Sequence, residues 1–230
     1  MRLVVLSDIH ANLAALQRVL AKMPSYDELY CLGDLVGYGP NPNEVIEALR
    51  DLRPAVVLSG NHDHAVVTGD WSGFVDHAVK AIEWTRGRLS KNNVDYLQAL
   101  KPSAKRRVQK IDIALFHGSP RDPLNEYIFP GTPSALLKQL LKLSGGTLLL
   151  QGHTHVPMSF RDDQSMLLNP GSVGQPRDGD SRASYMILEI EDRRISHKIR
   201  RVQYDVNKTA ETILDHGLPG FLAERLYLGV

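Results

Sequence analysis

Residues 2–10 read RLVVLSDIH, an apolar run that ends directly at Asp8 and His10. A short, leucine-rich and β-branched run of this kind is typical of a strand buried on both faces of a sheet. The next segment, Ala11–Lys22, carries apolar side chains at helical spacing. The stretch therefore predicts a strand followed by a helix, with a carboxylate and an imidazole at the turn between them.

The same alternation continues through the first 60 residues. A strand is expected at 29–32, a helix at 42–52 with Pro42 in its first turn, and a strand at 55–58. This order is typical of a parallel sheet with right-handed crossovers. Further on, the patterns predict helices at 74–89, 92–100, 133–143 and 205–215, and strands at 106–111, 113–116, 147–150, 165–168, 184–190 and 195–202. Short turns separate the last three strands, which favours an antiparallel meander or hairpins.

Length and composition indicate an ordinary globular chain. With 230 residues, 43% of them hydrophobic and 23% charged, the chain is expected to form a single domain over residues 1–230. Lys and Arg total 27 and Asp and Glu total 26, so a net charge of +1 provides no field that attracts nucleic acid or an anionic membrane. Nucleic acid and membranes are therefore not expected as partners.

Cysteine usage and the apolar runs bear on the compartment. Cys31 is the only cysteine, so no internal disulfide is expected, which fits a reducing cytoplasm. The apolar runs are far shorter than the roughly 20 residues that span a bilayer. The first run leads straight into Asp8 and His10, which is unlike a signal peptide. A cytoplasmic location is therefore expected.

Side chains that can bind metals follow five of the apolar runs. In open α/β sheets, ligands bind beyond the carboxyl ends of the strands, so these side chains would meet if the five strands share a sheet. Each motif alone is compatible with a turn or a helix cap, but five in the same position relative to a strand indicate a metal site. These residues are Asp8 and His10, Asp34, the block Asn61, His62, Asp63 and His64, then His117, and finally His153 and His155.

The ligand types narrow the choice of metal. Carboxylate, imidazole and amide groups without a thiolate suit Mn, Fe, Zn or Co better than Ca or Mg. A closed structural zinc site is disfavoured because such sites are rich in cysteine. The candidates are too many for one ion and fit two divalent ions that share a carboxylate, an arrangement that clamps a displacement at phosphorus. The seven candidate ligands are Asp8, His10, Asp34, Asn61, His117, His153 and His155.

The order of these blocks resembles the calcineurin-like metallophosphoesterases. Asp-x-His, Gly-Asp, Gly-Asn-His-Asp, His-Gly and Gly-His-Thr-His occur in that family's order between residues 8 and 155. The segments DIHANL (8–13), GDLVGYGPNP (33–42) and NPGSVGQPR (169–177) are similar to a subgroup of small, stand-alone bacterial and archaeal phosphodiesterase-like members. The resemblance implies an α/β fold, a four-layer α/β/β/α sandwich of two mixed sheets flanked by helices.

The resemblance also implies a role for each candidate. His62 would not bind metal but would serve as the general acid at the leaving group, and Asp63 would orient it by accepting its other ring proton. The nucleophile would be a hydroxide held by the metals. The ligands would divide into Asp8, His10 and His155 for the first ion, Asn61, His117 and His153 for the second, and Asp34 as the bridge.

Three further residues are candidates for substrate binding. Asn12 follows His10 closely and would either cap the first helix or contact substrate. Tyr38 would either line the pocket or shape its loop. Arg177 lies in a loop that resembles one near the metals of the family, and a guanidinium suits a bound phosphate; the alternative is a contact with Asp178 or another surface contact.

The expected function is a dinuclear metal-dependent hydrolase, a phosphodiesterase-like enzyme with manganese among its candidate metals. A small soluble phosphodiester or nucleotide is the expected substrate, because no basic groove or aromatic platform for a nucleic acid is visible. One alternative is a non-catalytic protein-binding scaffold on the same fold, like the retromer's phosphoesterase-like subunit, and another is a protein Ser/Thr phosphatase. The intact ligand set with His62 favours the enzyme. The apolar stretch 218–230 is expected to dock on the body of the chain or on a second copy in a homo-oligomer.

Overall fold

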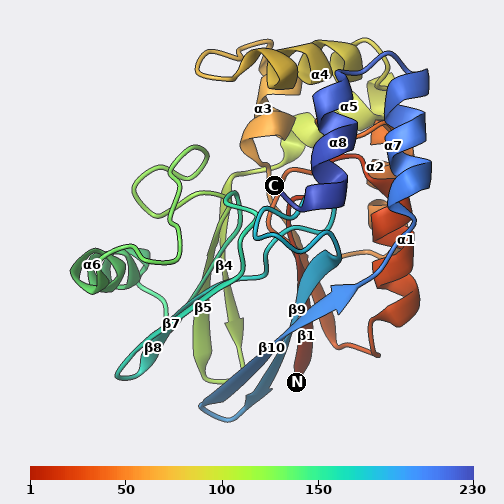
Figure 1. Cartoon of the computed structure of the whole chain (residues 1–230). Helices are drawn as coiled ribbons and strands as arrows, with labels where there is room; N and C mark the ends of the chain where they lie inside the picture. The colour runs from red at the N-terminus through yellow and green to blue at the C-terminus, as the bar shows by residue number, and fades with distance from the viewer.

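The computed structural model describes residues 1–230 and contains two five-stranded sheets (Figure 1). The first sheet has the spatial order β10 (Arg194–Val202), β9 (Ala183–Glu191), β1 (Arg2–Leu6), β2 (Glu28–Cys31) and β3 (Val56–Val57). The second has the order β4 (Ser103–Val108), β5 (Ile111–Phe116), β6 (Leu148–Gln151), β8 (Ser165–Asn169) and β7 (Met158–Asp162).

Each sheet has a parallel centre. In the first, β1, β2 and β3 run parallel, and the antiparallel hairpin β9–β10 extends the sheet beside β1. In the second, β5, β6 and β8 run parallel, with β4 and β7 antiparallel at the two edges. The carboxyl ends of the parallel strands therefore lie together at one edge of each sheet.

Eight helices complete the fold, and none is long and apolar enough to cross a membrane. Most follow the predicted ranges, since each presents one apolar stripe to a sheet or to a neighbouring helix. They are α1 (Leu13–Lys22), α2 (Pro42–Asp51), α3 (Asn61–Thr68), α4 (Asp76–Arg86), α5 (Lys91–Ala99), α6 (Ser134–Ser144), α7 (Val206–Asp215) and α8 (Gly220–Leu228).

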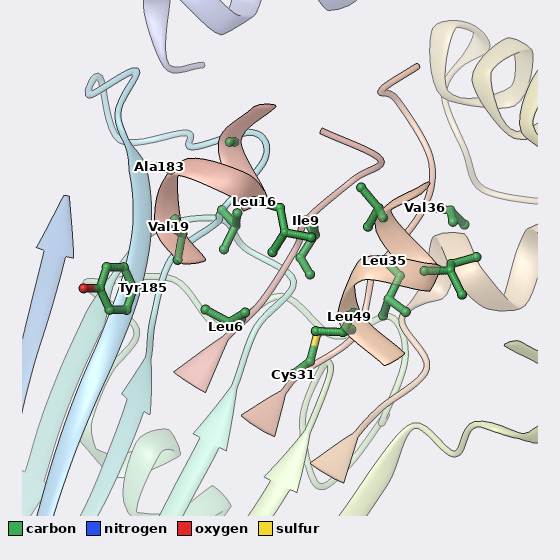
Figure 2. Close-up of a cluster of buried hydrophobic side chains, with 14 of the residues drawn as sticks. Leu6, Ile9, Leu16, Val19, Cys31, Leu35, Val36, Leu49, Ala183 and Tyr185 are labelled. Carbon is green, nitrogen blue, oxygen red and sulfur yellow. The ribbon is translucent and has the colours of Figure 1, made fainter. Parts of the chain in front are cut away.

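Successive side chains of a strand point to opposite faces of its sheet, and this alternation produces the layers. Leu3 and Val5 of β1 point between the two sheets, into an apolar cluster that also holds Leu148 and Leu150 of β6. Neighbouring residues of β1 point outward, and Figure 2 shows Leu6 packed in a second cluster with side chains of α1 and α2. Helix α6 covers the outer face of the second sheet. The chain thus forms the predicted four-layer α/β/β/α sandwich.

The C-terminal apolar stretch docks on the body of the chain. Helix α8 buries Leu222 and Leu226 in a cluster with Ala81 of α4 and Ile213 of α7. In Figure 1 the three helices lie together above the ends of the strands. This docking places one face of α8 near the strand ends that carry the polar motifs.

The structure decides between the strand arrangements that the sequence left open. The five strands with polar ends do not share a sheet: three lie in the first sheet and two in the second. The last three predicted strands do not form one meander, because β8 pairs with β6 while β9 and β10 form a hairpin in the other sheet. The residues of β8 are apolar on both faces, which suits its position inside the second sheet.

Three local elements also differ from the sequence-based expectation. Helix α3 begins at the polar residues Asn61–Asp63, where the sequence pattern predicted no helix, and strand β7 was not expected because polar residues alternate along it. The predicted strand 106–111 is broken, since β4 ends at Val108 and β5 starts at Ile111.

The layer between the sheets should dominate stability. Leu150 is fully buried there, so Leu150→Ala should lower the free energy of unfolding by about 2–5 kcal/mol, the usual cost of a lost side chain plus a cavity. Leu143 of α6 is 59% exposed, so Leu143→Ala is the matched control, with an expected change within about 0.5 kcal/mol. Urea unfolding measures both. Equal losses would show that this layer is not the core.

Candidate metal centre

The two sheets bring the polar strand ends to one place. Two groups of side chains have ligand atoms within 4.8 Å of one another, and both groups contain Asp34. Strands of the first sheet supply Asp8, His10 and Asp34, and strands of the second supply the other histidines. The first group is Asp8, His10, Asp34 and His155, and the second is Asp34, His117 and His153.

Each histidine of the two groups is oriented by a main-chain carbonyl. A ring N–H that donates to a carbonyl fixes the tautomer and turns the other ring nitrogen, with its lone pair, toward the group. The four bonds are His10 Nδ1 to Val36 O (3.1 Å), His155 Nδ1 to Gln175 O (2.6 Å), His117 Nδ1 to Leu32 O (2.8 Å) and His153 Nε2 to Asn125 O (3.2 Å).

The inward ring nitrogens face one another in pairs. His10 Nε2 lies 3.0 Å from His155 Nε2, and His117 Nε2 lies 3.1 Å from His153 Nδ1. Burial holds the pKa of His10 and His155 well below the usual value and lowers the pKa of His153 to about 2, so these rings are neutral. Two lone pairs at this separation repel each other, and a cation coordinated by both removes the repulsion. The residues therefore fit a metal ion.

The carboxylates point to the same conclusion. Burial raises the pKa of Asp8 to about 7, and its Oδ1 has no hydrogen-bond partner. Burial and the charge of Asp63 raise the pKa of Asp34 well above its usual value. Asp34 Oδ2 lies 3.5 Å from both His10 Nε2 and His117 Nε2, between the two groups. Positive charge at this point would stabilise both buried carboxylates in their ionised form.

The backbone is strained where it carries these side chains. Five of the residues have φ in the left-handed region, which costs a non-glycine residue about 1 kcal/mol or more and persists only where neighbours enforce it. Main-chain bonds enforce it here: His10 N donates to Asp34 O at 2.9 Å. The five φ angles are 53° at Asp8, 49° at His10, 52° at Asp34, 67° at His153 and 61° at His155.

Helix α3 approaches Asp34 closely because Gly60 precedes it. A Cβ at Gly60 would lie 1.9 Å from Asp34 Oδ1. The absence of a side chain there lets the His62 main-chain N–H donate to Asp34 Oδ1 at 2.9 Å. The first turn of α3 therefore holds one oxygen of Asp34 and leaves the other directed at the imidazoles.

The predicted role of Asp63 is wrong. Its carboxylate accepts the main-chain N–H groups of Leu35 (3.2 Å), Val36 (3.0 Å) and Gly60 (2.9 Å), and His62 Nδ1 has no hydrogen-bond partner. Asp63 thus organises the loop after β2 and the start of α3 instead of orienting His62. The His62 ring is positioned by packing, with ring centres 4.3 Å from Tyr38 and 4.9 Å from Phe74. His64, on the same helix, is exposed.

Of the two roles expected for Asn12, the structure shows the helix cap. Asn12 is 1% exposed and caps α1: its Oδ1 accepts the N–H of Ala15 at 3.1 Å. Its Nδ2 donates to Gly174 O at 2.9 Å, and its Oδ1 also accepts from Thr209. The polar atoms of this side chain are therefore used within the fold.

Tyr38 and Arg177 both line a cavity of about 530 Å³ that opens onto Asn61, His62 and His153. Arg177 Nη2 donates to Tyr38 Oη at 3.2 Å and to Gln175 Oε1 at 3.0 Å. The alternative contact between Arg177 and Asp178 is not formed, because Asp178 pairs with Arg201.

Sequence reasoning missed several walls of this cavity. Tyr127 stacks on His153 with ring centres 3.8 Å apart, and Phe129 stacks on Tyr127 at 5.7 Å. Tyr127 therefore gives the cavity an aromatic wall that the sequence had not revealed, and Phe129 supports it from outside the lining. The one available signal was the run NEYIF (125–129), which places aromatic residues in a polar loop. The other lining residues that were missed include Phe74, His77, Phe221 and Arg225.

Comparison with known proteins gives consistent matches. The profile described as the calcineurin-like phosphoesterase superfamily domain matches residues 1–193. An uncharacterized protein of Methanocaldococcus jannaschii is 36% identical, over 98% of this chain and 97% of its own. Phosphodiesterase YfcE of Escherichia coli is 27% identical over 82% of this chain and 88% of its own. The crystal structure of a metallophosphoesterase from Sphaerobacter thermophilus is 36% identical and matches with a TM-score of 0.86 over all of both chains.

Cation binding should release a proton at acid pH. The pKa of Asp8 is raised to about 7, so at pH 6 this carboxyl must lose its proton to bind a cation, whereas at pH 8 it is already ionised. A single group of this pKa should weaken the apparent affinity for Mn²⁺ about tenfold at pH 6 relative to pH 8. Calorimetric titration in two buffers of different ionisation enthalpy measures both quantities. An affinity independent of pH, with no proton released, would contradict this linkage.

Proposed function

The chain belongs to the calcineurin-like phosphoesterase superfamily, and we propose that it hydrolyses a phosphoester bond of a small substrate with the help of two divalent cations. The observation that carries this proposal is the pair of ligand groups that share Asp34. The cavity of about 530 Å³ beside them has the size of a small-molecule site, which favours a small substrate over a protein. We propose that residues 1–230 form one domain, since α8 contributes to the cavity wall.

The ligands divide between the two ions as the resemblance implies. Asn61 joins the second group, because its Oδ1 lies 3.2 Å from His117 Nε2. Imidazole, carboxylate and amide donors favour Mn, Fe, Zn or Co. When bound, the cations would supply positive charge for the phosphate oxygens and lower the pKa of a water molecule. The first ion would take Asp8, His10, Asp34 and His155, and the second Asp34, Asn61, His117 and His153.

We assign the role of general acid at the leaving group to His62. It is 3% exposed, lines the cavity and makes no side-chain hydrogen bond at Nδ1. Burial, and then the charge of Arg177, hold its pKa well below the usual value, so the free ring is neutral. A negatively charged substrate in the cavity shifts that pKa upward, and the ring can then give a proton to a departing oxygen.

We assign phosphate binding to Arg177. Its hydrogen bonds within the chain go to the neutral side chains of Tyr38 and Gln175, and its buried Nε has no partner. A guanidinium with free donors forms two parallel bonds to phosphate oxygens. The substrate phosphate would therefore lie between Arg177 and the ligand groups.

Asp34 should matter to both ions and His155 to one. After loading with Mn²⁺ and removal of free metal, the parent protein should hold two equivalents by elemental analysis. Asp34→Asn should lower the content of both ions because its carboxylate belongs to both groups, whereas His155→Ala should leave close to one equivalent. A parent that saturates at one equivalent, with Asp34→Asn unchanged, would reject the shared carboxylate.

His62→Ala should affect poor leaving groups most. General acid assistance contributes roughly 10²–10⁴-fold, and a nitrophenolate departs without it while an alkoxide does not. The variant should keep its metals and lose far more kcat on a nucleoside phosphodiester than on bis(4-nitrophenyl) phosphate.

The matched control for this variant is His64→Ala, because His64 is exposed on the same helix. It should keep the parent activity on both substrates. Equal losses on the two substrates for His62→Ala would assign His62 to positioning or charge stabilisation. Metal loss in that variant would make His62 a ligand.

A further inference from the structure

A second arginine lines the same cavity as Arg177. Arg225 lies on α8, and the side chains of the two arginines enter the cavity together with His62 and His77. Neither guanidinium pairs with an Asp or Glu side chain. Arg225 Nε donates to the Val230 main-chain oxygen, and its two terminal nitrogens have no hydrogen-bond partner within the chain. The cavity therefore contains two positive side chains and no Asp or Glu side chain among its lining residues.

The aromatic ring of Tyr38 lies close both to the two arginines and to the candidate metal centre. The Cζ atoms of Arg177 and Arg225 lie 5.7 Å and 5.9 Å from the centre of the Tyr38 ring. The same ring centre lies 4.7 Å from that of His10 and 4.3 Å from that of His62. An anion bound by the arginines would thus lie next to an anion bound at the metal ligands.

The electrostatics of the cavity favour an anion. Burial, and then the charge of Arg177, lower the pKa of Arg225 to about 10. Burial and the charge of Arg225 lower the pKa of His77 in the same way. Two partly desolvated guanidinium groups that repel each other are stabilised by a bound anion, and phosphate oxygens match their planar donor geometry.

We propose that Arg225, together with Arg177, forms an anion subsite beside the metal centre, and that this subsite takes a second phosphate of the substrate; Arg177, which lies between, would contact both this phosphate and the one at the metal ligands. The substrate class is then a diphosphate or a longer phosphoanhydride, in which a second phosphate neighbours the one at the metals. The identification as a substrate group rests on the proposed function. Helix α8 lies outside residues 1–193, the part of the chain that the family profile matches, so the C-terminal segment contributes Arg225 to this subsite and the matched part contributes Arg177.

The test compares two probes that cannot be hydrolysed. Methylenediphosphonate carries two phosphonate groups and methylphosphonate carries one, and calorimetry measures the dissociation constant of each on Mn²⁺-loaded protein. The ratio of the two constants is the preference for the second group. Arg225→Met should reduce this preference at least tenfold, and Arg225→Lys should retain part of it because the charge remains.

The control is Arg193→Met, which removes an exposed arginine in the turn between β9 and β10, at the end of the sheet away from the site. It should keep the parent preference. If Arg225→Met lowers the melting temperature, Arg225→Gln, which keeps a donor for Val230, replaces it. An unchanged preference in a folded Arg225 variant would overturn the subsite.

Measuring both binding and hydrolysis distinguishes a failure of the proposed function from a failure of the anion subsite. A parent that hydrolyses no phosphoester yet shows the Arg225-dependent preference would reject the proposed function and support the anion subsite. A parent that hydrolyses phosphoesters but binds both probes equally would reject the subsite and support the function.

Discussion

The buried carboxylate of Asp34 is the constraint on which the rest of the site depends. It is 1% exposed, it lies 3.5 Å from imidazole nitrogens of both ligand groups, and its other oxygen accepts a main-chain N–H at the start of α3. A carboxylate this deeply buried is costly unless positive charge lies beside it. The left-handed backbone at Asp34, the missing side chain at Gly60 and the carbonyl bonds of the histidines all maintain that one arrangement.

The same arrangement joins the two sheets. His117 follows β5 in the second sheet, yet its Nδ1 donates to Leu32 O, which follows β2 in the first. His153 follows β6, and its main-chain N–H donates to Asp8 Oδ2 at the end of β1. The apolar layer between the sheets fixes their separation, and these polar bonds fix how their carboxyl ends meet. The geometry of the site is therefore a consequence of how the sandwich closes.

Much of this could be predicted from the sequence because strands buried on both faces leave clear apolar runs. The polar residue after each run marks its carboxyl end, and all seven predicted ligands do lie together at the strand ends. The role of Asp63 could not be predicted, since it depends on three main-chain N–H groups that only the folded loops bring together. Arg225 and Tyr127 follow no strand end, so their positions in the cavity depend on how α8 and the loop after β5 dock. The left-handed φ angles of the ligand residues could not be predicted either, because Asp and His do not by themselves indicate this conformation.

The most direct test of the shared carboxylate is a crystal structure of the Mn²⁺-loaded protein with anomalous scattering recorded above the manganese absorption edge. Two anomalous peaks are expected, one among Asp8, His10 and His155 and one among Asn61, His117 and His153, with Asp34 oxygens in contact with both. One peak alone, or two peaks of which Asp34 contacts only one, would contradict the account.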